Sequence, residues 1–337
     1  MKKHLRLIIM VIVLIGAMLL MTTIKRPGIR VATVHEKPEY LLVIHGGAGD
    51  ITRDNLPDSA AQLYYEALQS ALVIGHRILD TGGSSLDAVE AVVRFMEDNP
   101  LFNAGKGAVF TIEGKNELDA SIMDGASGKA GAVAGVTNVK NPVTAARAVM
   151  EKSPHVMLAG HGAEAFAATQ GLEIVDPSWF FTSERFEGWK RAREKFDKKG
   201  TVGAVALDKH GNLAAATSTG GMTMKQWGRI GDAPVIGAGT FASNKTCAVS
   251  CTGHGEYFIR NAVAYDMSAR MEYRKSSLKN AANGILHQKL KGQGGTGGLI
   301  AIDKAGNFVM DFNTAGMFRG VLTPDGATKV MIFDDEQ

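Results

Sequence analysis

Threonine and glycine gather in the second half of the chain, where strand-like segments end. Thr201 follows Gly200 at the end of a charged segment, Thr219 ends the next apolar run, and Thr252 ends another. Each residue alone has a structural explanation, because threonine favours strands and glycine favours turns. Together they have a chemical logic, because a threonine hydroxyl is a weak nucleophile that needs an adjacent base.

The backbone itself could supply that base at Thr201. If the bond between Gly200 and Thr201 were cut, the new α-amino group would have a pKa near ~8 and stay partly neutral at physiological pH. Gly200 suits such a cut, because a residue without a Cβ tolerates strained backbone beside an attacking hydroxyl. The charged segment before it would leave the new chain end free to move away. The sequence therefore predicts cleavage between these two residues.

Several other chemistries are excluded by missing motifs. The chain has no G-x-x-x-x-G-K-[ST] phosphate loop, no H-E-x-x-H, no paired-cysteine zinc pattern and no G-x-S-x-G elbow. GQGGTG at 292–297 matches G-x-G-x-x-G, but a strand-like segment follows it, whereas a dinucleotide site needs a helix. The charge is balanced, with 37 basic and 34 acidic residues, so we expect no nucleic-acid partner.

The elements that must position these residues can be predicted from periodicity and turn signals. Apolar spacing predicts helices, of which the second has a capping box and the third begins with a proline. The predicted helices span 56–79, 84–98 and 142–150. Apolar runs predict strands at 40–44, before the turn HGGAG, and at 108–112 and 130–137.

Two similar segments predict antiparallel hairpins. ALDKHGNLAAA at 206–216 and AIDKAGNFVMD at 301–311 each join two strand-like runs through an Asp/Lys/Gly/Asn turn. With helices mainly in the first half and in 254–290, the chain is predicted to form a layered α+β domain. Segment 176–200 has seven basic and five acidic residues, which indicates a solvated helix or a mobile linker. Cys247 and Cys251 lie too far apart along a strand for a disulfide and are expected to be buried thiols.

The first 30 residues are predicted to be a signal peptide or a membrane anchor outside the catalytic fold. Basic residues precede an apolar run of 15 residues from Leu7 to Met21, which reaches 18 when extended to Ile24. That length fits a signal-peptide core and is close to the ~20 residues of a spanning helix. We therefore expect an exported, periplasmic or membrane-anchored protein, which would associate with membranes through this segment if the segment is an anchor.

Six motifs in this order resemble the isoaspartyl peptidase/plant-type L-asparaginase family of N-terminal-nucleophile hydrolases. The resemblance covers residues 40 to 320 and rests on long motifs. The motifs are HGGAGD, PLFNAGKGAVF, TVGAVALDKHGNLAAATSTGGM, GRIGDAPVIGAGTFA, SCTGHGE and GTGGLIAID.

The resemblance implies a four-layer αββα sandwich with two central, mainly antiparallel sheets. It implies one catalytic domain made as a precursor and cut between Gly200 and Thr201. Residues 31–200 would be the N-terminal (α) subunit, ending in a mobile linker, and residues 201–337 the C-terminal (β) subunit beginning with the nucleophile. A homodimer of such αβ heterodimers is expected.

The resemblance also implies roles for single residues in catalysis. Thr201 matches the nucleophile, and Thr219 matches the threonine that hydrogen-bonds near it and tunes its amine. Thr252 and Gly253 match the oxyanion hole, where donors stabilise charge that develops in the transition state. Asn103 matches a residue beside the nucleophile.

Three further matches concern substrate binding. Arg229 matches the residue that holds the substrate α-carboxylate, a bidentate role suited to a guanidinium group. Asp232 matches the carboxylate that binds the substrate ammonium group. Gly255, and also Gly253, match substrate-binding backbone positions.

The family further implies a structural sodium ion and no cofactor for catalysis. The ion would be held by backbone carbonyl oxygens of the loop that contains Met96, Glu97, Asn99, Phe102, Ala104 and Lys106. Lys106 departs from the small or apolar residue that relatives often carry there.

The sequence thus predicts hydrolysis of β-aspartyl dipeptides, of L-asparagine or of both, through a β-aspartyl ester of Thr201. One alternative is N4-(β-N-acetylglucosaminyl)-L-asparaginase, which shares the nucleophile and the Arg/Asp pair. An alternative of another class is a membrane-anchored amino-acid-binding protein on an inactive hydrolase scaffold. The intact Gly200-Thr201 pair, with Thr219 and Thr252, argues against the second.

Overall fold

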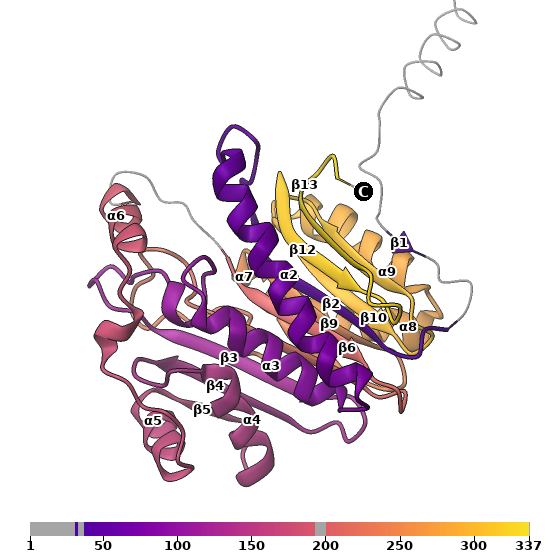
Figure 1. The fold of residues 1–337 in the computed structure, drawn as a ribbon, viewed down its shortest axis with the longest axis horizontal. Helices are drawn as coiled ribbons and strands as arrows, with labels where there is room; N and C mark the ends of the chain where they lie inside the picture. Colours follow the sequence, from indigo (N-terminus) through magenta and orange to yellow (C-terminus); the bar gives the residue numbers. More distant parts are fainter. Residues whose placement is uncertain (1–30, 33–36, 193–199, 337) are drawn as a thin grey trace, which may run out of the picture. The chain divides into compact units, whose positions relative to one another are not determined.

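The computed structural model describes residues 31–32, 37–192 and 200–336, which form two stacked sheets between helices (Figure 1). The larger sheet has the strand order β13-β12-β2-β6-β7-β3-β4-β5, and the smaller has the order β1-β11-β10-β9-β8. Every pairing between these strands is antiparallel except that of β4 with β5.

The strands of the larger sheet come from both halves of the chain. They are β2 (Leu41–Gly49), β3 (Leu118–Asp124), β4 (Ala130–Val136), β5 (Met157–Ala159), β6 (Val202–Leu207), β7 (Leu213–Thr219), β12 (Gly316–Leu322) and β13 (Thr328–Phe333). The strands of the smaller sheet are β1 (Val31–Ala32), β8 (Thr240–Ala242), β9 (Cys247–Gly253), β10 (Gly297–Asp303) and β11 (Phe308–Phe312).

Helices cover the outer face of each sheet. Those of the first half are α2 (Asp58–Asp80), α3 (Ser85–Asp98), η1 (Gly105–Gly107), α4 (Pro142–Lys152), α5 (Gly160–Thr169), η2 (Pro177–Phe180) and α6 (Ser183–Ala192). Those of the second half are α7 (Gly255–Asn261), α8 (Val263–Arg274), α9 (Leu278–Asn283) and the π-helical η3 (Gly284–Leu290).

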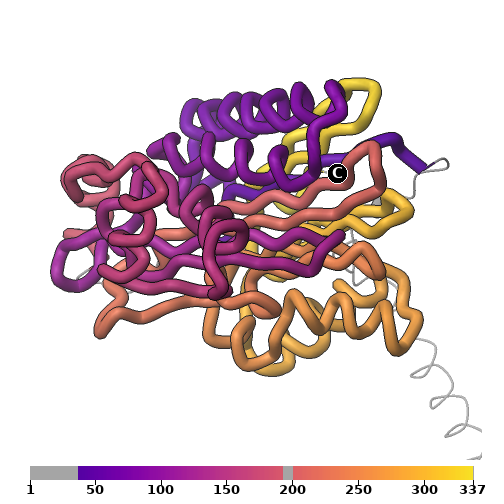
Figure 2. Tube along the Cα trace, turned by 90° about the horizontal axis from the view of Figure 1, so that it is seen from below, coloured from indigo at the N-terminus to yellow at the C-terminus, as the bar shows by residue number. Residues whose placement is uncertain are grey.

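Three apolar cores hold these layers together. One lies between α2, α3, α4 and the larger sheet, a second between the two sheets, and a third between the smaller sheet and helices α7 to η3. Figure 2 shows this order edge-on, with the indigo helices on one side, the strands in the middle and the orange helices on the other. The predicted αββα sandwich with two mainly antiparallel sheets is confirmed.

The predicted helix starts and hairpins are confirmed in their chemical detail. At the start of α3, the Ser84 hydroxyl accepts from the Asp87 N–H, as the N-cap residue of a capping box does, and donates to the Asp87 carboxylate. The segments 206–216 and 301–311 are the antiparallel hairpins β6–β7 and β10–β11. In both turns an aspartate, Asp208 or Asp303, accepts from two backbone N–H groups of the turn.

Two local predictions were wrong. Residues 108–112 form no strand, because side chains and loops take up their backbone groups: Asn116 Nδ2 donates to the carbonyls of Ala108 and Val109. The predicted turn HGGAG instead belongs to β2, which continues to Gly49 through a register shift against β12. Gly47 has φ +115°, which a residue with a side chain rarely adopts, and so allows this irregular strand.

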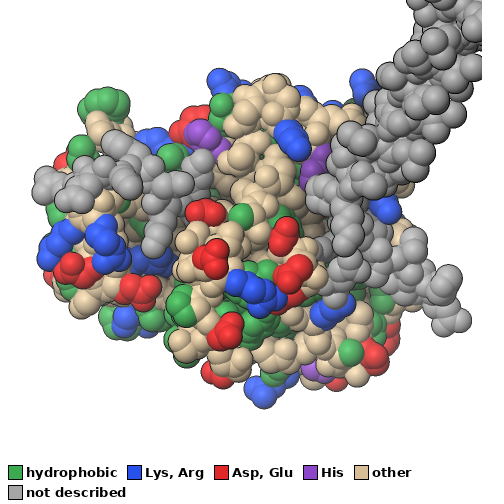
Figure 3. Space-filling view, turned by 90° about the horizontal axis from the view of Figure 1, so that it is seen from above, with side chains coloured by type: hydrophobic (Ala, Val, Ile, Leu, Met, Phe, Trp, Pro, Cys, Tyr) green, Lys and Arg blue, Asp and Glu red, His purple; other side chains and the backbone are tan. Residues whose placement is uncertain are grey.

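The charged segment contains a helix, and both cysteines are buried. Within 176–200 the described part holds η2 and α6, whose carboxyl-terminal end precedes the undescribed residues 193–199. Both thiols lie on β9 with no disulfide between them, as predicted. On the face in Figure 3, acidic and basic side chains intermix, in keeping with the small net charge of +3.

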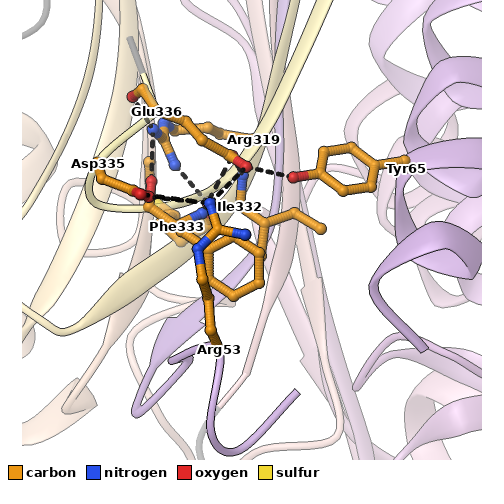
Figure 4. Close-up of polar contacts among 8 residues, drawn as sticks. Arg53, Tyr65, Arg319, Ile332, Phe333, Asp335 and Glu336 are labelled. Carbon is orange, nitrogen blue, oxygen red and sulfur yellow. Dashed lines mark hydrogen bonds and ion pairs between the residues drawn. The ribbon is translucent and has the colours of Figure 1, made fainter. Parts of the chain in front are cut away.

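Near the C-terminus, a fully buried arginine binds the end of the chain (Figure 4). Arg319 on β12 donates from Nη2 to the backbone carbonyls of Phe333 and Glu336, at 3.1 and 2.9 Å. The Glu336 carboxylate in turn accepts from the Tyr65 hydroxyl on α2. The last described residues, up to Glu336, are therefore bound both to the larger sheet and to the first long helix.

Candidate active site

The sequence-predicted nucleophile lies at the start of β6, next to the end of β7. The antiparallel register pairs Val202 with Ser218, which brings Thr201 opposite Thr219. Thr201 is buried, and its Oγ1 donates to Thr219 Oγ1 at 3.1 Å. Thr219 therefore lies within hydrogen-bond distance of the Thr201 hydroxyl.

The carbonyl group of Gly200 is held by two donors. Its oxygen accepts from Asn103 Nδ2 at 2.7 Å and from Thr219 Oγ1 at 2.9 Å. Asn103 is itself fixed, because it accepts from the Val109 N–H at 2.9 Å. A carbonyl bound in this way is polarised, and negative charge that develops on its oxygen would be stabilised.

Behind Thr201, a buried histidine that the sequence analysis did not single out binds the same residue. His45 on β2 is fully buried; its Nδ1 lies 3.0 Å from the Thr201 carbonyl oxygen and its Nε2 lies 2.9 Å from Ser250 Oγ. Because the carbonyl can only accept, Nδ1 carries the proton and Nε2 accepts from Ser250. Burial lowers the pKa of His45 to about 3, so the imidazole is neutral at physiological pH.

From Ser250 a chain of buried hydroxyl groups crosses between the sheets. Ser250 Oγ lies 2.7 Å from Thr217 Oγ1, and Thr240 Oγ1 donates to Thr217 at 2.5 Å. Ser121 Oγ lies 2.8 Å from Thr240 Oγ1 and donates to the Ala233 carbonyl at 2.6 Å. Since Ala233 follows Asp232, this chain links the Thr201 backbone to the loop of the expected substrate-binding residues.

That loop, between β7 and β8, brings Arg229 and Asp232 together against Gly255. A Cβ on Gly255 would lie 2.7 Å from Arg229 Nη2 and 2.9 Å from Asp232 Oδ1, so a side chain at this position would displace both groups. Asp232 is buried and its Oδ2 has no hydrogen-bond partner among the described residues. Burial raises the pKa of Asp232 to about 7, although the Arg229 charge opposes the rise.

The guanidinium group of Arg229 is also bound to a carboxylate that the sequence analysis did not predict. Arg229 Nε and Nη2 donate to the two oxygens of Glu256 at 2.9 and 3.1 Å. Glu256 also lies 3.3 Å from His254 Nε2. Hydrogen bonds and charge from Arg229 lower the pKa of Glu256 below its ordinary value, against the opposing effect of burial.

Thr252 and Gly253 end β9, on the sheet that faces β6 and β7. Thr252 is two residues after Ser250 on the same strand, so both side chains lie on one face. The Thr252 hydroxyl is buried and has no partner among the described residues. Gly253 has φ +143°, and a Cβ there would lie 2.5 Å from Gly297 Cα and the Thr296 carbonyl oxygen.

Comparisons with known proteins identify the family of this chain. The sequence model of the asparaginase family matches residues 38–332. The chain belongs to this family. It is 52% identical over 293 residues to the isoaspartyl peptidase of Escherichia coli, a match that covers 83% of this chain and 91% of the relative.

More distant members of the asparaginase family match over a similar part of the chain. The isoaspartyl peptidase/L-asparaginase of Mus musculus is 42% identical over 285 residues, covering 82% of this chain and 86% of the relative. The plant-type L-asparaginase of Pyrococcus horikoshii is 42% identical over 298 residues, covering 82% and 94%.

The predicted location, exported, periplasmic or membrane-anchored, is corrected. The family match covers residues 38–332 and does not include the apolar segment, so it does not support an export signal or a membrane anchor there. No helix in the described residues is long and apolar enough to cross a membrane. The segment itself, residues 1–30, lies outside the described residues.

The loop expected to hold sodium in this asparaginase-family chain connects α3 to η1. Its donors would be backbone carbonyl oxygens, which are suitable ligands for a hard cation. The ammonium group of Lys106 lies over the Trp179 ring, with Nζ 4.0 Å from its centre. Among the described residues, no group of three or more His, Cys, Asp or Glu side chains could hold a metal. Sodium binding therefore remains a prediction, in which backbone carbonyl oxygens are the only ligands from the chain.

Glu97, in the same loop region, has a second feature that the sequence analysis missed. Its side chain is fully buried, and its Oε1 accepts from Ser218 Oγ at 2.6 Å and from the Val143 N–H at 2.9 Å. Burial raises the pKa of Glu97 to about 8, although these hydrogen bonds oppose the rise. A protonated carboxyl group thus contacts β7 at Ser218, the residue before Thr219.

Sequence reasoning could not have identified His45 or Glu256 as contacts of the site. Both lie inside motifs that were quoted, HGGAGD and SCTGHGE, but motif membership does not reveal which atom a side chain binds. The one available sequence signal for these two contacts is that His45 and Glu256 each stand next to a glycine, the residue type that a closely packed site needs.

Proposed function

We propose that this protein is a self-processing amide hydrolase that cleaves β-aspartyl dipeptides, L-asparagine or both. The observation that carries the proposal is the contact of Thr201 Oγ1 with Thr219 Oγ1, beside a Gly200 carbonyl bound by two donors. Membership of the asparaginase family, with relatives named isoaspartyl peptidase and L-asparaginase, supports the substrate class.

Self-cleavage is the first step of the proposal. Thr201 Oγ1 attacks the carbonyl carbon of Gly200 while its proton is relayed through Thr219 Oγ1, which takes it up as it gives its own proton to the Gly200 oxygen. Asn103 Nδ2 stabilises the negative charge that develops on the Gly200 oxygen. The C–N bond then breaks, so that Gly200 is joined to Thr201 by an ester and the Thr201 amine takes the proton. Water hydrolyses the ester and leaves Thr201 as a new chain start.

Substrate binding uses the pair of opposite charges beside Gly255. Arg229 binds the α-carboxylate of the substrate, and Asp232, with its unpartnered Oδ2, binds the α-ammonium group. The backbone at Gly253 and Gly255 allows close approach, because a side chain at either position would clash with its surroundings. An aspartyl group held in this way points its side-chain carbonyl away from the clamp.

Turnover repeats the chemistry of self-cleavage on this carbonyl. The free amine of Thr201 accepts the hydroxyl proton as Oγ1 attacks. It then passes this proton to the leaving nitrogen, which departs as an amine or ammonia while an ester between aspartate and Thr201 forms. Thr252, whose hydroxyl is buried and unpartnered among the described residues, together with Gly253, stabilises the oxyanion. Water activated by the same amine then releases aspartate. All of these steps use groups of the chain itself.

The proposal includes the assembly expected from the sequence. Residues 31–200 and 201–337 would be the two subunits of one catalytic domain, and two such pairs would form a homodimer. Sodium, if bound by the carbonyl oxygens of the α3–η1 loop, would stabilise the segment that carries Asn103.

The variant Thr201→Ala tests the proposed function. We expect it to remain a single chain of full length and to lose hydrolysis of a β-aspartyl dipeptide such as β-Asp-Leu, because nucleophile and base disappear together. Mass spectrometry of the purified protein gives the chain termini, and release of aspartate gives the activity. Thr246→Val is a matched control: it removes an equally buried hydroxyl, bonded to Ser268, away from the site. Two fragments from Thr201→Ala would overturn the proposal.

A further inference from the structure

We propose that Glu256 is a positioning residue for substrate binding, which holds one edge of Arg229 so that its other edge faces the substrate. The proposal rests on the function proposed above. Its basis is the pair of hydrogen bonds from Arg229 Nε and Nη2 to the two carboxylate oxygens of Glu256, at 2.9 and 3.1 Å. A side-on pair of this kind fixes the plane of a guanidinium group.

The donors of Arg229 are enough for two carboxylates at once. A guanidinium group has five N–H donors, of which Glu256 uses the one on Nε and one of the two on Nη2. Both donors on Nη1 and the second on Nη2 remain, and one from each of these nitrogens forms the end-on fork that a second carboxylate can bind. Glu256 and a substrate α-carboxylate can therefore occupy Arg229 together without competing.

Two glycines allow the guanidinium group to lie in this orientation. A Cβ at Gly231 would lie 2.8 Å from Arg229 Nη1, and a Cβ at Gly255 would lie 2.7 Å from Nη2. Both terminal nitrogens thus lie against bare backbone, and the end-on fork is not covered by a side chain at either position. Glu256, the residue after Gly255, supplies the contact from the remaining side.

Without Glu256, Arg229 would have a nearer partner than the substrate. Asp232 also packs against Gly255, because a Cβ at Gly255 would lie 2.9 Å from Asp232 Oδ1. The other carboxylate oxygen of Asp232, Oδ2, has no hydrogen-bond partner among the described residues. A freed guanidinium group would pair with Asp232 and neutralise the carboxylate that should bind the ammonium group. Glu256 therefore keeps the two charges of the clamp separate, and it orders a long side chain before the substrate arrives.

Glu256 could instead act as a competitor that the substrate must displace. The two roles predict opposite effects of removing the carboxylate. A competitor blocks the site, so its loss would strengthen binding. A positioning residue prepares the site, so its loss would weaken binding.

The test compares Glu256→Ala and Glu256→Gln with the wild type in the full chain. We expect KM for β-Asp-Leu and the Kd for aspartate, measured by calorimetry, to rise about 10- to 100-fold in Glu256→Ala. We expect kcat to change less than about threefold, because Arg229 does not contact the reacting carbonyl. Glu256→Gln should lie between the two, since its amide oxygen can still accept from Nε. Glu173→Ala, which breaks an exposed ion pair with Lys140, is the matched control.

Three outcomes would overturn the positioning role. They are an unchanged Kd for aspartate, a lowered Kd as expected of a competitor, and an equal loss of kcat and self-cleavage as expected of damage to the fold. Self-cleavage on gels is therefore recorded for each variant. Failure of the proposed function would look different, with a wild-type chain that neither cleaves itself nor hydrolyses β-Asp-Leu. Aspartate binding would still test Glu256 in that case, because it needs the clamp and not the nucleophile.

Discussion

At the scale of residues, the site combines charged groups with deep burial, and burial decides which of them are ionised. Asp232 shows the effect most clearly, because removal from water raises the pKa of this carboxyl group to about 7. The carboxylate that should bind an ammonium group is therefore ionised only partly at neutral pH. Binding of an amino-acid ligand must complete the ionisation, which makes binding sensitive to pH.

We predict that aspartate binds more weakly as the pH falls below 7. Below its pKa, Asp232 is protonated and loses the charge that pairs with the ammonium group, so the Kd should rise by up to about tenfold per pH unit. Calorimetric titrations between pH 5.5 and pH 8 would measure the change. The variant Asp232→Asn should bind weakly at every pH, with no such slope. A Kd for the wild type that stays constant over this range would contradict the prediction.

The sequence was most informative about residues that belong to long motifs. Thr201, Thr219 and Asn103 were singled out, and the structure brings them to one carbonyl group. His45 was not, because its role depends on a register that places β2 beside β6, and no local pattern encodes that register. Side-chain contacts between segments far apart in the chain can be read only from the folded structure.

At the scale of elements, one buried carboxyl group joins two helices and a strand behind the site. Glu97 near the end of α3 accepts from the Val143 N–H in the first turn of α4 and from Ser218 on β7. Its other oxygen has no partner among the described residues, which suits a protonated carboxyl group better than a carboxylate. The position of β7, and so of Thr219, depends on this junction.

We predict that Glu97→Gln stabilises the protein at alkaline pH relative to the wild type. The pKa of Glu97 is about 8 in the folded state, whereas an unfolded glutamate ionises near 4.5. The contribution of this group to stability is therefore full below pH 4.5 and is lost as the pH rises to 8. Because glutamine does not titrate, the difference in unfolding free energy should move in its favour by up to about 1.4 kcal/mol per pH unit in that window.

Denaturant unfolding of both proteins at pH 5 and pH 8 would measure this difference. Glu173→Gln, at an exposed glutamate, serves as the control and should follow the wild type at both pH values. Parallel stabilities of Glu97→Gln and the wild type at the two pH values would mean that Glu97 is ionised in the fold.

Elements with explicit end signals could be predicted from the sequence, and those without could not. The capping box at Ser84 and the proline at 142 marked α3 and α4 correctly, because these signals act within one helical turn. The apolar run at 108–112 predicted a strand, yet Asn116 and the loop at Lys225 satisfy its backbone instead. An apolar run shows that a segment is buried, but it does not show which groups take its hydrogen bonds.

At the scale of the whole molecule, the order of strands mixes the two sides of the proposed cleavage point. In the larger sheet, β2 from before Thr201 lies between β12 and β6 from after it, and β3 from before it pairs with β7. The C-terminal residues also contact α2 through Glu336 and Tyr65 (Figure 4). The two subunits would therefore share one sheet and one core.

We predict that the two fragments produced by cleavage stay together under native conditions. Separating them would break the backbone hydrogen bonds on both edges of β2 and expose the apolar core to water. The free-energy cost of this separation is far greater than the effect of one broken peptide bond on the stability of the fold. Size-exclusion chromatography should give a single peak that contains both fragments, and they should separate only in denaturant. Fragments that elute apart without denaturant would contradict this prediction.

The position of β2 has a further consequence for how the active protein comes into being. An uncut chain can place this strand between its neighbours in a first-order process, since all three segments are tethered. Once the peptide bond is gone, the same step becomes an encounter between two molecules, and its rate depends on their concentration. The mature form would then be easy to make once and slow to remake after denaturation, so its lifetime would be governed by the barrier to unfolding more than by the equilibrium.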